Sequence, residues 1–282
     1  MLSWTFFLEA LLRSTALLLG CVLLLRLSKR RSAALRHRLL LWVFALLVTL
    51  PIFCVFLPPI AIPVLQSASA RRASVTVHQV SSKAVTGPRV HEINWPAVIW
   101  VLGFTISFAP ALLGTLSVLR MLRSARKFHS QALDQALLLL GQNGQTPPIS
   151  ISHAVSIPIT CGVFRPCILL PGEAAGWTSS RFQAVISHEL SHVRRHDIAA
   201  QVFAHFVSAL WWFQPAVWLF RRKLRTESEM ACDAEAIRGL RPSVYANELL
   251  AIAKSLGRDT RLSSFALVWL VRDFSKPAFG QC

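Results

Sequence analysis

Residues 188–192 read His-Glu-Leu-Ser-His, and this stretch decides how the rest of the chain is interpreted. On a helix, positions i and i+4 project from one face, so His188 and His192 can bind one zinc ion together. Glu189 lies beside them and can take a proton from a water molecule as a general base. The same pattern also occurs as a polar stripe on surface helices, so a catalytic metal site needs further ligands.

A third ligand is available downstream, where residues 227–233 read Glu-Ser-Glu-Met-Ala-Cys-Asp on a second predicted helix. Glu229 and Asp233 are four residues apart and share a face, so one can bind the metal while the other orients a ligand histidine. The alternative is a solvated acidic face that balances nearby basic residues, which are Arg221, Arg222, Lys223 and Arg225.

Three other side chains are weaker candidates. His196 follows His192 by four residues, so it is either a helper beside the ligands or an ordinary surface histidine. His205 lies in an apolar segment, which favours a satisfied core residue over a ligand. Tyr245 is the only tyrosine, and it either donates to a developing oxyanion or packs on the following helix.

The composition is that of a membrane protein. Of the 282 residues, 54% are apolar and 15% are charged, against about 45–50% and about 25% in soluble domains. The basic residues that give the net charge of +17 lie beside the apolar runs. At such positions basic residues fix the orientation of membrane helices and contact anionic lipid. A lipid bilayer is therefore expected as a partner, and direct binding to nucleic acid is not. None of the six cysteines forms a CxxC pair, so no disulfide framework is expected, in agreement with a reducing compartment for the C-terminal half of the chain.

Three apolar segments are long enough to cross a bilayer, which requires about 20 helical residues. They cover about 3–25, 39–65 and 95–119. A signal peptide is the competing interpretation of the first, but its early Glu9 and the basic stretch that follows it argue against removal. Prolines at 51, 58, 59 and 63 are expected to kink or end the second helix.

Basic residues crowd the connection 26–38 and the exit 120–127, and are sparser in the loop 66–94. The positive-inside rule therefore predicts an extracytoplasmic loop 66–94 and a cytoplasmic region after 119. The expected organisation is a transmembrane region 1–119, a catalytic domain 120–256 and an unassigned tail 257–282.

Within the catalytic domain, the pattern predicts helices at 128–140 and about 179–195, the latter with Thr178 or Ser179 as N-cap. It also predicts strands at 149–153 and 167–170. Segment 198–220 has no formal charge and is either a fourth span, an interfacial helix or a buried helix. We favour a buried or interfacial helix, because a span would place 188–192 and 229 on opposite sides of the membrane. Pro215 also predicts a break there.

Most of residues 1–256 resembles the BlaR/MecR-type membrane metallopeptidases, which are bacterial signal transducers. The resemblance rests on four stretches, 156–171, 188–197 (HELSHVRRHD), 211–216 (WWFQPA) and 229–233. It implies that His188, His192 and Glu229 bind Zn²⁺, that Glu189 is the base and that Asp233 lies behind the ligands. It implies structural roles for Arg195 and Asp197.

The resemblance also implies the fold and the role. The expected fold is a mainly α membrane protein, with three N-terminal transmembrane helices and a helical, gluzincin-like zincin domain that contains a small β-sheet. The strands around 149–170 resemble an edge on which extended substrate can pair. The expected location is the bacterial inner membrane, with the catalytic domain in the cytoplasm.

The expected activity is a zinc metalloendopeptidase in regulated proteolysis, which cleaves a protein such as a transcriptional repressor or cleaves itself, and which can form a homodimer. A housekeeping membrane protease and a non-catalytic receptor that keeps the fold as a scaffold are the alternatives. Relatives that sense β-lactams carry a large extracellular domain after a further span, whereas this sequence shows only the short apolar run 262–271. Either the chain is truncated or the sensor lies elsewhere, so antibiotic sensing does not follow from the resemblance.

Overall fold

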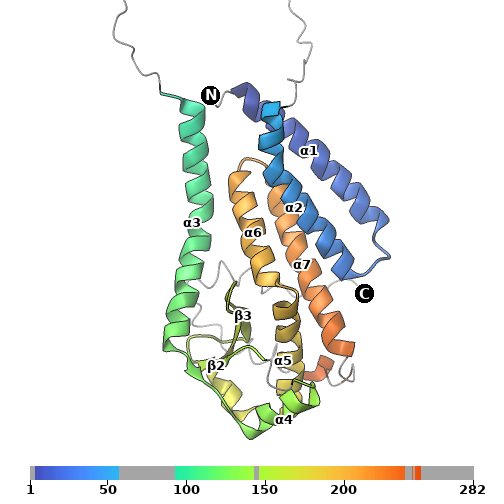
Figure 1. The fold of residues 1–282 in the computed structure, drawn as a ribbon, viewed down its shortest axis with the longest axis vertical. Coiled ribbons are helices and arrows are strands. Elements are labelled where there is room, and N and C mark those ends of the chain that lie inside the picture. Colours follow the sequence, from blue (N-terminus) through green and yellow to red (C-terminus); the bar gives the residue numbers. More distant parts are fainter. Residues whose placement is uncertain (1–3, 57–92, 143–145, 239–242, 244, 249–282) are drawn as a thin grey trace, which may run out of the picture.

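The structure, a computed structural model, describes residues 4–56, 93–142, 146–238, 243 and 245–248 (Figure 1). Most of the predicted loop 66–94, the prolines at 58, 59 and 63, and the predicted tail 257–282 lie outside the described residues. The described chain is mainly helical with one small mixed sheet, as the predicted fold class requires.

Three long apolar helices can each cross a membrane by length and composition. They are α1 (Trp4–Leu27), α2 (Ala33–Phe56) and α3 (Trp95–Ser124). Helix α2 begins six residues before the predicted span, and α3 continues five residues beyond it. The predicted bounds were drawn at the basic residues, but a basic side chain at a membrane surface does not end a helix. Both helices therefore extend out of the apolar region toward residues 126–194 (Figure 1).

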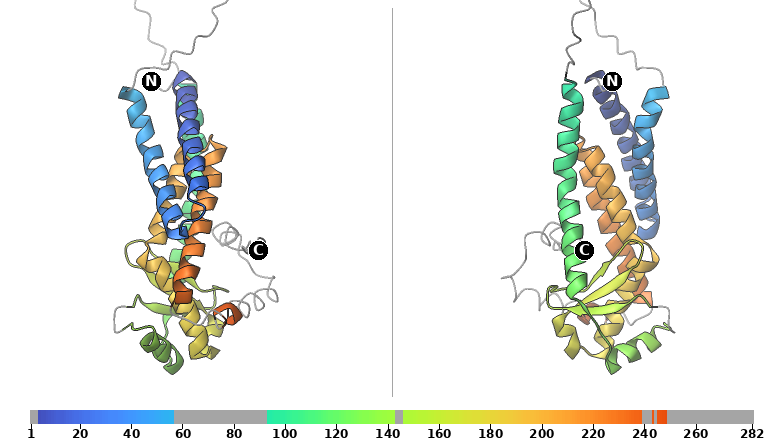
Figure 2. Two further views of the ribbon diagram at one scale, coloured as in Figure 1. Left: turned by 90° about the vertical axis from the view of Figure 1, so that its right-hand side faces the viewer. Right: turned by 60° about the vertical axis from the view of Figure 1, so that its left-hand side comes forward.

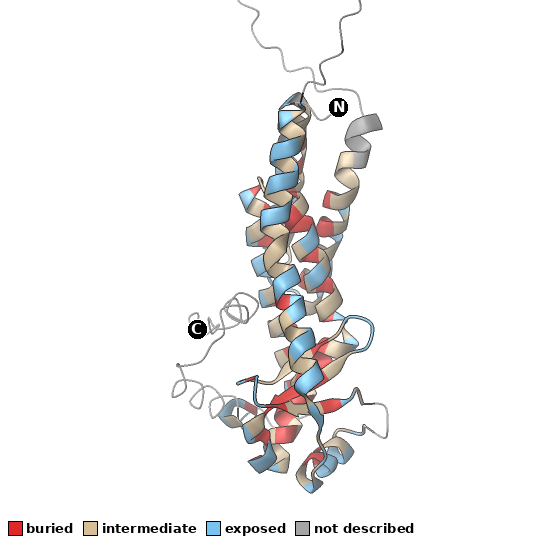
Figure 3. Ribbon diagram, turned by 90° about the vertical axis from the view of Figure 1, so that its left-hand side faces the viewer, coloured by how far each residue is buried: buried red, intermediate tan, exposed pale blue. Residues whose placement is uncertain are grey.

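Figure 3 shows exposed positions along the length of α3. Large apolar residues occupy many of these positions, among them Leu102, Ile106 and Leu113. Of the whole helix, Gly114 is the one fully buried residue. A soluble protein does not present such a surface to water, whereas a bilayer covers it at no cost.

The sheet has the strand order β1-β2-β4-β3. Strands β2 (Ile149–Ser152) and β4 (Cys167–Pro171) are parallel, and they confirm the two predicted strands. Strands β1 (Arg126–Lys127) and β3 (Ile159–Cys161) pair with them antiparallel and were not predicted. Two or three residues are too few to show the alternation by which a strand is recognised in sequence.

Helix α4 (Gln131–Leu139) begins three residues later than the predicted helix 128–140. The chain remains part of the sheet beyond β1, because the backbone N–H of Phe128 donates to the carbonyl of Ile149. The side chain of Ser130 then caps the helix. Together with β2 and β4, α4 forms a small core against helix α5 (Ser179–Arg194), with Phe182 and Ile186 fully buried.

Segment 198–220 is neither a span nor a single helix. It is divided between α6 (Asp197–Leu210) and α7 (Pro215–Arg238), which form an antiparallel hairpin with the expected break before Pro215. The hairpin rises between α3 on one side and the α1–α2 pair on the other (Figures 1 and 2). Because the chain enters and returns, residues 188–192 and 229 remain on the same side, which removes the difficulty that a fourth span would create.

The tip of this hairpin is hydrogen-bonded to two spans. The indole of Trp211 donates to the carbonyl of Leu47 on α2 at 3.1 Å, and the amide of Gln214 donates to the hydroxyl of Ser14 on α1 at 3.2 Å. Ser14 and Gln214 are both buried. These contacts surround the irregular backbone of the turn 211–214 with protein, which is the condition under which such a backbone is tolerated between membrane helices.

The third span packs on the same tip. The indole of Trp100 on α3 donates to the carbonyl of Leu210 at 3.2 Å. The ring of Trp212 lies against Gly103, where a Cβ atom would collide with it. All three spans therefore hold the hairpin whose two helices lead down to the candidate site.

Candidate metal centre

Helix α5 carries the His-Glu-Leu-Ser-His stretch and is fixed at both ends. The hydroxyl of Thr178 caps its start by accepting from the amide of Arg181, as one of the two predicted caps. Its apolar face, including Phe182 and Ile186, packs on the sheet and α4. The opposite face therefore turns His188 and His192 toward α7.

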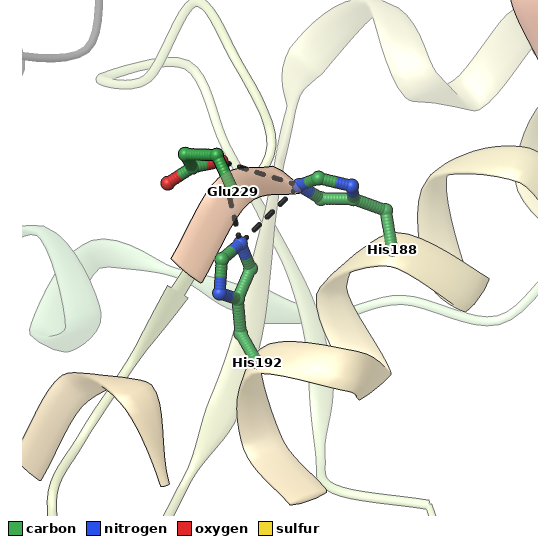
Figure 4. Close-up of side chains that lie close together, drawn as sticks. All are labelled: His188, His192 and Glu229. Atoms are coloured by element: carbon green, nitrogen blue, oxygen red, sulfur yellow. Dashed lines mark hydrogen bonds and ion pairs between the residues drawn. The ribbon is translucent and has the colours of Figure 1, made fainter. Parts of the chain in front are cut away.

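The structure brings His188, His192 and Glu229 together (Figure 4). The Nε2 atoms of the two histidines are 3.2 Å apart. The Oε2 atom of Glu229 lies 3.6 Å from Nε2 of His188 and 3.7 Å from Nε2 of His192. A tetrahedral zinc ion with bonds of about 2.0–2.1 Å separates its ligand atoms by about 3.3 Å. The three donor atoms therefore fit one zinc ion, with the fourth position left for water or substrate.

A buried carboxylate holds His192 in the orientation that a metal ligand needs. Nδ1 of His192 lies 2.9 Å from Oδ2 of Asp197, a residue that is 2% exposed. The same oxygen accepts a hydrogen bond from Nε of Arg195 at 3.2 Å. Burial tends to raise the pKa of Asp197, but the contacts with His192 and Arg195 outweigh it and lower that pKa to about 2. Asp197 therefore keeps the proton of His192 on Nδ1 and leaves Nε2 free to bind a metal.

His188 has a corresponding partner on α7. Its Nδ1 atom lies 3.0 Å from Oδ1 of Asp233, and the hydroxyl of Tyr245 donates to the same oxygen at 2.8 Å. Burial tends to lower the pKa of His188, but Asp233 and Glu229 raise it to about 9. Tyr245 thus contacts Asp233 and His188. The sequence had suggested either a donor to an oxyanion or a residue that packs on the following helix, and this arrangement is neither.

Glu229 is held as a carboxylate. Although burial acts to raise its pKa, the hydrogen bonds from His188 and His192 lower that pKa well below the ordinary value. An ionised glutamate next to two imidazoles is the donor set of a zinc site with two histidines and one glutamate.

Glu189 is anchored to the sheet. Its Oε2 atom accepts a hydrogen bond of 2.6 Å from the hydroxyl of Thr160 on β3, and Glu189 is 7% exposed. Thr160 could not be found from sequence, because it precedes Glu189 by 29 residues in a strand too short to recognise.

The remaining candidates lie at or beyond the edge of this group. His196 is exposed, takes a left-handed backbone conformation (φ 55°) between α5 and α6, and lines a shallow pocket with His192 and Thr160. His205 is half-buried and contacts the carbonyl of Ser107 on α3 and the guanidinium of Arg221 on α7. It lies apart from the three clustered ligands and has partners of its own.

Comparison with known proteins finds a matching family and similar relatives. The sequence profile of the family described as BlaR1 peptidase M56 matches residues 5–276. The regulatory protein BlaR1 of Bacillus licheniformis is 25% identical over 194 residues, which are 68% of this chain and 31% of that protein. The methicillin resistance mecR1 proteins of Staphylococcus aureus and Staphylococcus epidermidis are 26% identical over 91 residues, 32% of this chain and 16% of theirs. The chain thus spans less than a third of the length of these relatives.

Proposed function

Because the chain belongs to the BlaR1 peptidase M56 family, we propose that it is a membrane-embedded zinc metalloendopeptidase. One observation carries the proposal: three donor atoms from α5 and α7 lie at the separations that a tetrahedral zinc ion requires. Three helices that can cross a membrane support the membrane setting, and membership of a peptidase family supports proteolysis.

The proposed reaction is the hydrolysis of a peptide bond. His188, His192 and Glu229 hold the zinc ion, which supplies Lewis-acid polarisation and acidifies water when bound. Glu189 takes the proton of the attacking water on its carboxylate and delivers it to the leaving amine. Thr160 keeps that carboxylate in one orientation through its 2.6 Å hydrogen bond. Asp197 and Asp233 keep the two imidazoles correctly oriented.

The proposed substrate is an extended protein segment. Among the described strands, β3 lies at the edge of the sheet, and its residue Thr160 touches Glu189. A peptide that adds to this edge by backbone hydrogen bonds would pass directly beside the catalytic base.

The proposed setting is a cytoplasmic catalytic domain beneath the bacterial inner membrane. It is supported by the basic residues that crowd 26–38 and 120–127, both of which lie at the end of the spans that faces α5. Regulated cleavage of a protein such as a repressor is the proposed role, since one relative is named a regulatory protein.

The proposal is tested with the purified chain in detergent micelles. We expect about one zinc per chain and cleavage of a proteome-derived peptide library that is lost in Glu189→Gln, while the zinc is retained. Cleavage that survives in Glu189→Gln would overturn the assigned base. A folded, zinc-replete wild type that cleaves nothing would favour a scaffold receptor, and cleavage of many unrelated membrane proteins in cells would favour a housekeeping protease.

A further inference from the structure

Two thiols face each other across β4 and β3, the strand whose Thr160 contacts Glu189. Cys161 ends β3 and Cys167 begins β4, and the two residues are direct partners in the antiparallel pair. Their sulfur atoms are 3.1 Å apart. Direct partners of this kind have Cα atoms about 4.5–5.5 Å apart, which lies inside the range that a disulfide spans.

The turn between them already brings the strands together. Gly162 has a φ of 88°, and a Cβ atom there would collide with the carbonyl of Arg165. Because glycine alone adopts this conformation without strain, the chain reverses tightly and returns Cys167 to the position opposite Cys161. The backbone therefore needs no rearrangement for the two sulfur atoms to bond.

The two thiols differ in a way that suits stepwise oxidation. Cys161 is buried, and the thiol contact between the two residues raises its pKa far above the ordinary value. Cys167 is half-buried, and the hydrogen bond from Cys161 lowers its pKa. Cys167 is therefore the thiol that an oxidant reaches first and that is more readily ionised, and Cys161 is placed to resolve the product.

We propose that Cys161 and Cys167 are a reversible modification site, a thiol pair that hydrogen peroxide oxidises to a disulfide. The Cys167 sulfur attacks one oxygen of the peroxide, the O–O bond breaks, and a sulfenic acid and water form. The Cys161 sulfur then attacks the sulfenic sulfur, the S–S bond forms, and the S–O bond breaks with loss of a second water. In sum, two thiols and one peroxide give one disulfide and two waters. In a reducing compartment such a pair is transient and serves redox sensing.

Oxidation acts on the catalytic base through one intervening residue. Thr160 adjoins Cys161 and donates to Glu189. A disulfide fastens the end of β3 to β4 and removes the freedom with which this edge strand adapts to a peptide. This consequence rests on the proposed peptidase function, whereas the modification site itself does not.

The site is tested on the full chain in detergent micelles, oxidised with hydrogen peroxide, denatured, alkylated and digested with trypsin. Trypsin does not cleave between Arg165 and Pro166, so both cysteines stay in one peptide. We expect that peptide to lose the mass of two hydrogen atoms and to resist alkylation until dithiothreitol is added. Cys167→Ala should abolish the mass loss, and Cys21→Ala, in α1, should preserve it. Alkylation of both thiols after peroxide treatment of folded wild type would overturn the proposal.

A second measurement separates the site from its consequence. Oxidation is expected to lower peptidase turnover several-fold and reversibly in the wild type and to leave that of Cys167→Ala unchanged. Disulfide formation without a change in turnover would overturn the regulatory consequence alone. Absence of turnover in the reduced wild type would overturn the proposed function and leave the mass measurement valid.

Discussion

The guanidinium of Arg36, in the first turn of α2, donates from Nε to Oε2 of Glu227 at 2.8 Å. Glu227 is fully buried, also pairs with Lys223 at 2.8 Å, and precedes the zinc-ligand candidate Glu229 by two residues. Next to Arg36, Nε2 of His37 lies 3.7 Å from Oδ1 of Asp197. A membrane helix thus contacts the acidic residues that support both sides of the site.

Replacing Arg36 should weaken the site from a distance. In Arg36→Met, Glu227 keeps only Lys223 as a partner, and loss of one member of a buried ion pair costs about 3 kcal/mol. We expect a lower unfolding temperature and weaker zinc retention, measured by thermal unfolding and by competition with a chelator. Arg38→Met, at an exposed position of the same helix, is the matched control. Equal behaviour of the two variants would show that α2 does not support the site.

Glu229→Ala should lose zinc, because two histidines alone make an incomplete site. The measurement is zinc content per chain by atomic emission. Glu227→Ala is an unsuitable control, since Glu227 is buried between Arg36 and Lys223 and its removal leaves both cations unpaired. Glu235→Ala is suitable, because the Glu235 side chain is 38% exposed and pairs at 3.6 Å with the exposed Arg194. Zinc retained in Glu229→Ala would exclude Glu229 as the third ligand.

Asp197→Asn should lower zinc affinity by about 10–100-fold, the usual effect of losing the partner behind a ligand histidine. The amide can no longer enforce the proton on Nδ1 of His192, although its shape is nearly unchanged. The dissociation constant is measured with a fluorescent zinc chelator. Asp134→Asn, on the exposed side of α4, should bind zinc as tightly as the wild type. An affinity unchanged in Asp197→Asn would contradict the assigned role of Asp197.

The stabilisation that zinc confers should grow with pH. In the zinc-free chain the pKa of His188 is raised to about 9 from 6.5, so its ion pairs stabilise the fold fully below about pH 6.5 and are lost as pH rises through 9. Zinc binding instead requires deprotonated imidazoles and gains about tenfold in affinity per pH unit for each proton displaced. The unfolding temperatures of the zinc-loaded and zinc-free chains should therefore diverge between pH 7 and 9. A constant difference would indicate that His188 is already neutral at pH 7.

Gly103→Ala should disturb the hairpin tip, because the added Cβ atom collides with the ring of Trp212. Overpacking of this kind costs about 1–3 kcal/mol, and we expect a lower unfolding temperature. Gly20→Ala in α1 meets open space and should be neutral or slightly stabilising. Similar unfolding temperatures for the two variants would mean that the tip does not pack on α3 as described.

Sequence predicted what is local and periodic. The three long helices follow from apolar runs, and the clustering of His188 with His192 follows from helical spacing. The strands at 149–153 and 167–170 were found because they alternate or are bounded by turn residues. The pairing of Glu229 with those histidines, 37 residues later, was expected from acid spacing and family resemblance, and the structure places it there.

What sequence could not supply is contact across large separations. Thr160 beside Glu189 and Arg36 beside Glu227 are 29 and 191 residues from their partners, and no spacing rule joins them. The sequence assigned Asp197 only a structural role. It does not show that a sharp turn at His196 ends α5 and returns the chain, so that Asp197 contacts His192. The sequence indicated a buried or interfacial helix with a break at Pro215, but it could not show that the chain reverses at this break and forms the hairpin α6–α7.

The hairpin tip has a consequence for activity. Helix α5, which carries His188 and His192, is connected to α7, which carries Glu229, through α6 and a turn that contacts α1, α2 and α3. Glu229 reaches His188 and His192 only when α7 has returned from that enclosure beside α5. On the proposed peptidase function, a chain whose hairpin has not docked among α1, α2 and α3 lacks the complete set of three ligands and therefore has no activity, so docking of the hairpin acts as a condition for proteolysis.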